Sequence, residues 1–211
     1  MDSAVTLLQP VLMRTRGCPE NNALWALRKA FADVCRQTEC WRDSVSVAVA
    51  SDAEPIGTDE EWVRIPDPAY SARILRIHRA LLAKSGEAAY KDVPLASCRV
   101  HRGESDWLVV RGRGTLEAGD SVSLDVSLVP DEIGATLSEI PPGIVRVAGQ
   151  AATDLAVATL CNQSGRPWTD REAATLAALD AANGIRRILA DISCGEMDLP
   201  ARAIPESPVE G

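Results

Sequence analysis

Aromatic residues are scarce in this chain of 211 residues, and phenylalanine occurs only once, at Phe31. A folded core must therefore be filled mainly by alanine, valine, leucine and isoleucine. Because hydrophobic residues still make up 46% of the chain, there is enough apolar surface for one large domain or two small ones. The composition predicts a globular protein and excludes a largely disordered one.

An excess of basic residues is also missing, since 22 lysines and arginines face 30 aspartates and glutamates and the net charge is −8. Proteins that grip nucleic acid place clustered lysines and arginines against its phosphates. The acidic balance therefore argues against DNA or RNA as a tightly bound ligand. An acidic wall could still enclose DNA, because it repels the phosphates and does not adhere to them.

Long apolar runs and Cys-x-x-Cys pairs are absent. The sequence has no stretch of about 20 apolar residues of the kind that spans a membrane. It opens with no basic region followed by an apolar segment, so no signal peptide is expected. The six cysteines are Cys18, Cys35, Cys40, Cys98, Cys161 and Cys194. We expect them to be reduced and mostly buried in a protein made in the cytoplasm, with disulfides formed later, in a particle outside the cell, as the alternative.

Apolar residues recur at helical spacing near the start of the chain. The pattern predicts a short helix over residues 3–14, with a kink at Pro10 and a stop at Gly17. Pro19 predicts the first residue of a longer amphipathic helix that runs to Thr38. The expected inward faces are Val5, Leu8 and Leu12 in the short helix, and Leu24, Leu27, Phe31, Val34, Cys35 and Thr38 in the long one.

Two further helices are expected toward the end of the chain. An alanine-rich helix over residues 144–162 carries small side chains that would let another helix approach closely. Thr169, as N-cap, and Glu172 form a capping box that predicts the start of a last helix, which runs to Ile192. The tryptophans, which we expect to pack helix ends and sheet edges onto the core, are Trp25, Trp41, Trp62, Trp107 and Trp168.

The middle of the chain has the two-residue periodicity of β-strands. Residues 44–49, 61–65 and 107–111 are expected strands, and residues 70–83 fit either a helix or a strand, with a strand preferred. Residues 121–128 alternate between polar and apolar without a fault. This last pattern predicts a sheet with one solvent-facing side.

Together these elements predict an α+β fold. Residues 1–42 and 140–193 are expected to form one antiparallel helical bundle, with an antiparallel β domain of residues 43–139 inserted between them. Residues 194–211 contain three prolines and end in Glu-Gly, so we expect an extended C-terminal tail that does not pack alone.

Motifs for catalysis, cofactors and metals are weak. Residues 111–114 (Arg-Gly-Arg-Gly) lack the third glycine and the following helix of a phosphate-binding loop, and are interpreted as a hairpin turn. Cys98 and His101 would face opposite sides of a strand, which disfavours a metal site or a nucleophile and base pair. Acidic residues at 59–61 and 131–132 are interpreted as solvated loops. We expect no catalytic, cofactor or metal site.

Two segments resemble the head-to-tail adaptor (connector) proteins of tailed bacteriophages. The first is Gly17-Cys18-Pro19, followed by Ala26-Leu27-Arg28-Lys29-Ala30-Phe31, Cys35-Arg36-Gln37-Thr38 and Trp41. It is similar to the G-C-P turn, the helix patterned A-L-R-x-A and F-C-x-x-T, and the Trp that open this family, although Val34 stands where phenylalanine often precedes the cysteine. The second is Gly165-Arg166-Pro167-Trp168-Thr169-Asp170, which resembles the family's G-K/R-P-W-S/T-D connection between helices.

The resemblance implies a structural protein of the virion at the head–tail junction. Subunits of this family form a ring, commonly of twelve copies, that sits on the portal protein around the DNA channel and joins the capsid to tail or neck proteins. The resemblance also implies a tail that docks into the portal, where the expected contact residues are Leu199, Arg202, Ile204 and Val209. The alternatives are a neck or tail-completion protein of the same particle, an unrelated cytoplasmic binding module, and an enzyme.

Overall fold

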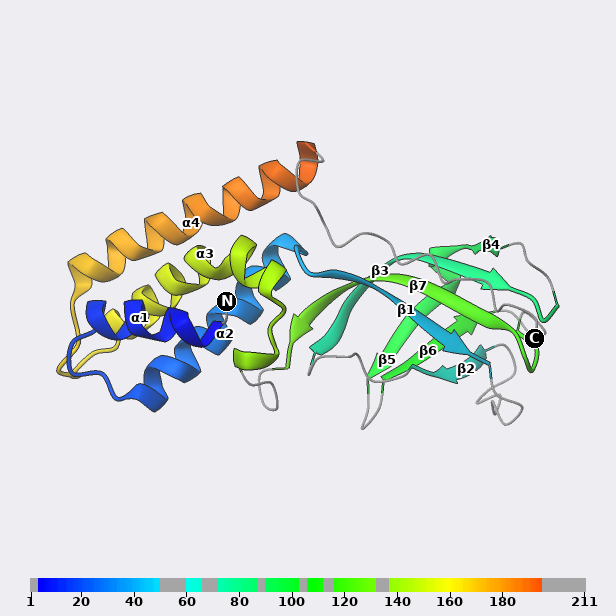
Figure 1. The fold of residues 1–211 in the computed structure, drawn as a ribbon, viewed down its shortest axis with the longest axis horizontal. Coiled ribbons are helices and arrows are strands. Elements are labelled where there is room, and N and C mark those ends of the chain that lie inside the picture. Colours follow the sequence, from blue (N-terminus) through cyan, green and yellow to red (C-terminus); the bar gives the residue numbers. More distant parts are fainter. Residues whose placement is uncertain are drawn as a thin grey trace. The chain divides into compact units, whose positions relative to one another are not determined.

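The computed structural model describes residues 4–49, 60–65, 72–86, 90–102, 106–111, 116–131 and 137–194. Within them the chain is α+β, as expected, with helices toward both ends of the sequence and antiparallel strand pairs between them (Figure 1). The chain divides into two compact units. The helical unit contains residues 4–41, 72–73, 129–131 and 137–194, and the sheet unit contains the other described residues.

The first helical segment consists of two parts. A 3-10 turn, η1 (Ala4–Leu7), precedes the α-helix α1 (Leu8–Arg14). Pro10 lies in the first turn of α1, where its missing N–H breaks no helical hydrogen bond, so the helix continues through it. The predicted inward face is wrong at Val5, which is 49% exposed, whereas Val11 is fully buried.

The second helix, α2 (Glu20–Thr38), is amphipathic as predicted, and it buries Phe31 completely. Pro19 is its N-cap and not its first helical residue, since its backbone is extended with ψ at 141°. The helix ends where Glu39 adopts a left-handed φ of 51°. The N–H of Glu39 then donates to the Cys35 carbonyl at 2.8 Å, which satisfies one carbonyl of the last turn.

The third helix, α3 (Pro142–Cys161), lies between α2 and α4 (Arg171–Cys194) in the helical unit (Figure 1). Small side chains allow helix backbones to approach closely. A Cβ placed on Gly184 of α4 would come within 3.0 Å of the Cβ of Ala151, so the predicted close approach is confirmed. The fully or nearly fully buried alanines of α3 are Ala148, Ala151, Ala152 and Ala156.

Apolar composition makes α3 stand out among the described helices. It alone among them is long and apolar enough to cross a membrane by length and composition, with a mean hydropathy of 1.3 over its most apolar window. However, 72% of that window is buried inside the protein. Its contacts with α2 and α4 account for the composition, which is that of a core helix.

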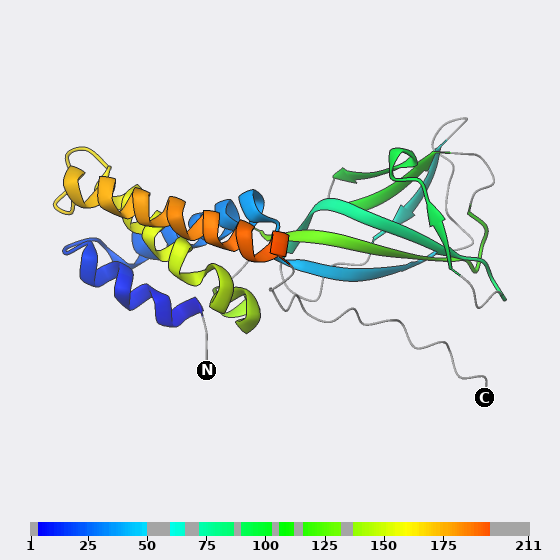
Figure 2. The ribbon, with the colours of Figure 1, turned by 90° about the horizontal axis from the view of Figure 1, so that it is seen from above.

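The described strands form two sheets. The larger has the order β1-β7-β3-β4, and Figure 2 shows β1, β7 and β3 side by side. The smaller has the order β2-β6-β5. The strand preferred for residues 70–83 is confirmed by β3, whereas β4 is too short for periodicity to predict it. The bounds are β1 (Arg42–Ala48), β2 (Glu60–Arg64), β3 (Ala72–Ala83), β4 (Tyr90–Val93), β5 (Cys98–Arg102), β6 (Asp106–Arg111) and β7 (Ser121–Pro130), with 3-10 turns at Leu95–Ser97 and Leu137–Glu139.

Strand β7 corrects one expectation from the sequence. Its alternation does mark a strand, but its serine side is not open to solvent, because Ser123 is 8% exposed and Ser127 is fully buried. β7 lies between β1 and β3, so its small serine side chains are flanked on both sides by the side chains of neighbouring strands. On the same side, the Ser44 hydroxyl of β1 donates to Asp125 of β7 at 3.0 Å, so this polar face is used for contacts within the protein.

The close contact of α3 with α4 generates a stability prediction. Gly184→Val should force a branched side chain against Ala151 and lower the free energy of unfolding by about 1–3 kcal/mol. Ala190→Val on the exposed side of α4 is the matched control and should change it by less than about 0.5 kcal/mol. Urea unfolding followed by far-ultraviolet circular dichroism measures both. Equal effects of the two variants would contradict close packing at Gly184.

Candidate interaction site

The start of the first segment that resembles the adaptor family meets the second segment at one end of the helical unit. A Cβ on Gly17 would lie 3.8 Å from the Cβ of Pro167, although the two residues are far apart in the sequence. Cys18 and Trp168 are each 8% exposed, and Cys161 at the end of α3 is fully buried. We call these five residues the helix-end junction.

The turn that delivers Gly17 and Cys18 to the junction is built by local hydrogen bonds. The Thr15 hydroxyl donates to the Val11 carbonyl at 2.8 Å, and the Cys18 N–H donates to the Thr15 carbonyl at 3.0 Å. Gly17 has a φ of +84°, a conformation that residues with a side chain rarely adopt. The glycine thus allows the chain to reverse between α1 and α2.

The connection between α3 and α4 shows that the predicted capping box is wrong. Asp170, not Thr169, is the N-cap, because its Oδ1 accepts the Ala173 N–H at 3.0 Å. The Thr169 hydroxyl is engaged inside the connection, where it accepts the Arg166 N–H at 3.0 Å and donates to the Gln163 carbonyl. Thr169 therefore shapes the connection and Asp170 starts the helix.

Trp168 anchors this connection to the core, as predicted for a tryptophan at a helix end. Its indole N–H donates to Gln163 Oε1 at 3.3 Å, and the Arg166 guanidinium lies 5.9 Å from the ring centroid. Trp41, at the end of α2, is also buried at 3% exposure. Trp25 corrects the expectation for the scattered tryptophans, because it is 52% exposed on α2.

The cysteines are free thiols, as expected. Burial raises the pKa of the Cys18 and Cys161 thiols at the junction, and the Asp170 charge raises that of Cys161 further. A hydrogen bond to Cys40 and then burial raise the pKa of Cys35. Thiols held protonated in this way are poor nucleophiles, so they serve as small core side chains.

An ion pair next to the junction joins α1 to α3. Arg14 Nη1 donates to Asp154 Oδ1, and Gln150 Nε2 donates to Asp154 Oδ2 at 2.9 Å. The Asp154 side chain is 6% exposed, so its charge is almost fully withdrawn from water. Removing Arg14 would leave the buried Asp154 charge without its cation, but Arg14 is itself 39% exposed, so the cost should be below the roughly 3–5 kcal/mol of a fully buried pair. The pair is therefore a structural clamp on the end of α1.

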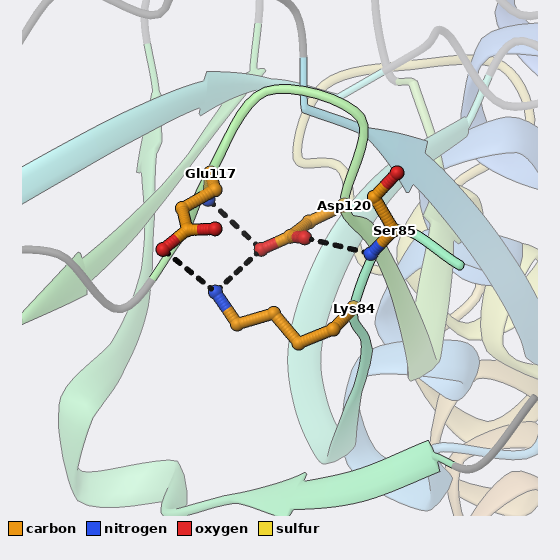
Figure 3. Close-up of polar contacts among 4 residues, drawn as sticks. All are labelled: Lys84, Ser85, Glu117 and Asp120. Atoms are coloured by element: carbon orange, nitrogen blue, oxygen red, sulfur yellow. Dashed lines mark hydrogen bonds and ion pairs between the residues drawn. The ribbon is translucent and has the colours of Figure 1, made fainter. Parts of the chain in front are cut away.

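The sheet unit contains a second buried carboxylate, in a cluster that we call the Asp120 clasp (Figure 3). Lys84 Nζ lies 2.8 Å from Asp120 Oδ2 and 3.9 Å from Glu117 Oε1. The Ser85 N–H donates to Asp120 Oδ1 at 3.0 Å, and the Glu117 N–H donates to Oδ2 at 2.8 Å. The main chain of Asp120 also accepts the Val49 N–H at 2.9 Å. One residue thus ties together the ends of β1 and β3 and the turn before β7.

The electrostatics of the Asp120 clasp suit a structural role. Burial of Asp120 by itself raises the pKa of its carboxyl, but the ion pair with Lys84 and the two backbone N–H donors outweigh burial, so the pKa is lowered. Both carboxylate oxygens are occupied by donors. A carboxylate that is held ionised and fully hydrogen-bonded is poorly placed to act as a general base.

The residues weighed from sequence for chemistry are not brought together in the described part of the chain. Cys98 and His101 both lie on β5, three residues apart and so on opposite sides of the strand. No group of three or more His, Cys, Asp or Glu side chains among the described residues could hold a metal ion. The expected portal contacts Leu199, Arg202, Ile204 and Val209, and the Gly112–Gly114 turn, lie outside the described residues.

Sequence reasoning missed the large apolar side chains that the helical unit exposes. Leu176 and Leu179 of α4 are each 58% exposed, because its alanine-rich side and not its leucines faces α3. Their spacing away from the buried alanines is the signal that could have found them. The other exposed members in this unit are Val5, Met13, Trp25 and Leu189.

Comparisons with known proteins add little to this picture. No family model matches the chain, and no curated protein matches it. Among solved structures, a chain from "Neck of empty GTA particle computed with C6 symmetry" resembles this one at 15% sequence identity with a TM-score of 0.29. The likeness covers 86% of this chain and 87% of that one. At so low a TM-score, fold and function must be argued from the residues of this chain.

The corrected cap generates a prediction with a built-in control. Asp170→Ala should lower the free energy of unfolding by about 1 kcal/mol, because the Ala173 N–H loses its acceptor. Glu172→Ala tests the capping box and should have a smaller effect, since Thr169 is engaged elsewhere. The urea midpoints of the two variants distinguish Asp170 as N-cap from the Thr169–Glu172 capping box. A larger loss of stability for Glu172→Ala than for Asp170→Ala would support the capping box.

The Asp120 clasp predicts how the stability of the protein depends on pH. Asp120→Asn should destabilise the protein at pH 7 by about 3 kcal/mol, because Lys84 loses its buried partner. Since the folded pKa of Asp120 is lowered, its contribution is complete above the unfolded value of about 3.9 and is lost as pH falls through the folded value. The difference between wild type and variant should therefore shrink in acid.

Denaturant unfolding at a series of pH values measures this difference. Asp92→Asn is the matched control, because Asp92 pairs with Arg79 on the surface and should leave the midpoint almost unchanged. A gap between wild type and Asp120→Asn that is as large at pH 3 as at pH 7 would show that the carboxylate is not the stabilising group.

Proposed function

We propose that this chain is a structural neck component of a tailed-phage particle, and specifically a head-to-tail adaptor without catalytic activity. The observation that carries the proposal is the helix-end junction. Gly17 and Cys18 begin the first segment that resembles the adaptor family (residues 17–41), and they pack near Pro167 and Trp168 of the second (residues 165–170). Parts of both segments are therefore neighbours in the structure.

The residues that carry the resemblance to the adaptor family also have structural roles in this chain. Gly17 permits the chain reversal, Trp168 seals the connection, and Asp170 caps α4. Each task holds the four-helix arrangement in shape, which we propose to be an antiparallel bundle. None of them places a reactive group at the surface, in keeping with an assembly role.

The proposed assembly is a ring, of twelve copies in this family, on the portal protein around the DNA channel. The net charge of −8 supports a wall that repels DNA phosphates and lets the genome pass. We further propose that residues 194–211 dock on the portal through Leu199, Arg202, Ile204 and Val209. A segment that binds in extended form can add its apolar side chains and main chain to a partner surface.

Imaging of the protein mixed with the portal protein of the same virus tests the proposal. Electron microscopy should show a ring on the tail-side end of the portal for the full chain, and no ring for a chain that lacks residues 194–211. A ring on a tail tube instead would identify a neck or tail-completion protein. A full ring formed by the truncated chain would refute docking through the tail, and no binding to any particle component would refute the proposal itself.

A further inference from the structure

The outer face of α4 carries an exposed apolar surface. The inward face of this helix uses Ala174, Ala177, Ala181 and Ile188. Leu176 and Leu179 lie on the other side, one turn apart and each 58% exposed. Glu172 and Asp180, both exposed, flank them along the helix. We call these four residues the leucine patch, which is apolar in the middle and acidic at its rim.

The outer face of α2 carries a surface of complementary character. Trp25 is 52% exposed, and the ammonium of Lys29, one turn later, lies 5.4 Å from its ring centroid. The nearby charges Asp33 and Arg36 form an ion pair with each other at 2.7 Å. Trp25 and Lys29 together, which we call the tryptophan patch, therefore offer an aromatic surface with a positive rim.

The two patches point away from the core in different directions. α3 packs extensively against α4 on one side and against α2 on the other, whereas α2 and α4 contact each other over only a short stretch (Figure 1). The leucine patch lies on α4 opposite the residues that face this core, and the tryptophan patch lies on the side of α2 away from the buried Leu27. One copy of the chain can therefore present the leucine patch to one neighbour and the tryptophan patch to another.

We propose that a second copy of this chain occupies each patch, with the leucine patch of one copy seated on the tryptophan patch of the next. Leu176 and Leu179 would cover the Trp25 ring, and Glu172 and Asp180 would face Lys29. Tryptophan is among the residues that most often dominate binding at interfaces. Contact between two different patches is head-to-tail, the type of contact that closes into rings. The inference deepens the proposed ring by naming its subunit interface.

Sedimentation velocity of the full chain over a range of concentrations tests the interface, with a reductant present because Cys194 is exposed. The wild-type chain should associate as its concentration rises. Trp25→Ala, and separately Leu176→Ser with Leu179→Ser, should each weaken association by roughly tenfold or more. These side chains are exposed, so thermal unfolding should remain close to wild type.

Two matched controls separate this interface from general surface hydrophobicity. Met13→Ser and Leu189→Ser change apolar side chains that are 74% and 43% exposed on the same unit but lie outside both patches. Both control variants should associate like the wild type. Weakening by the controls equal to that of the patch variants would contradict the assignment.

Mixing the two patch variants distinguishes head-to-tail contact from a symmetric one. Each variant keeps one intact patch, so the mixture should form heterodimers that grow no further, although neither variant associates alone. No rescue on mixing, patch variants that associate like wild type, or a wild-type chain that stays monomeric at every concentration would each overturn the interface. A chain that self-associates through the patches but ignores the portal would leave the interface standing and refute the adaptor role.

Discussion

The helical unit depends on the close approach of α3 to its neighbours. With a single phenylalanine in the chain, the core cannot be filled by large rings and is instead closed by bringing backbones together over alanine and glycine. Dispersion contacts weaken within a fraction of an ångström, so such a core tolerates little change in side-chain volume. The same arrangement places the alanines of α4 against the core and leaves Leu176 and Leu179 exposed, where the proposed interface would use them.

In each unit, a buried carboxylate holds together chain segments through hydrogen bonds and an ion pair. Asp154 holds the end of α1 on α3, and Asp120 holds the ends of β1 and β3 beside the turn before β7. In both cases the cationic partner, Arg14 or Lys84, comes from an element distant in sequence, so the charge is paired only in the folded chain. Asp120 and Asp154 are the buried charged residues among those that the structure describes, and their contacts give both a structural role.

The sequence predicts the elements whose patterns are long and regular, and fails where tertiary contacts choose between equivalent candidates. The helix around Phe31 and the strand of residues 121–128 follow from periodicity. Thr169 and Asp170 are both competent caps, and only the bonds that occupy Thr169 decide between them. The clasp could not be foreseen, because its lysine and its aspartate are 36 residues apart and meet through two turns. The sequence shows the two motifs of the helix-end junction, but it does not show that they are in contact.

The central claim is that copies of this chain join head-to-tail through α4 and α2, and zero-length cross-linking tests it most directly. A carbodiimide joins an ammonium to a carboxylate only when they touch. In an assembly made from equal parts of ¹⁴N- and ¹⁵N-labelled chains, mass spectrometry should find Lys29 linked to Glu172 or Asp180 in mixed-isotope peptides, which arise only between copies. Mixed-isotope links that join Lys29 elsewhere, or no links between copies at all, would contradict the account.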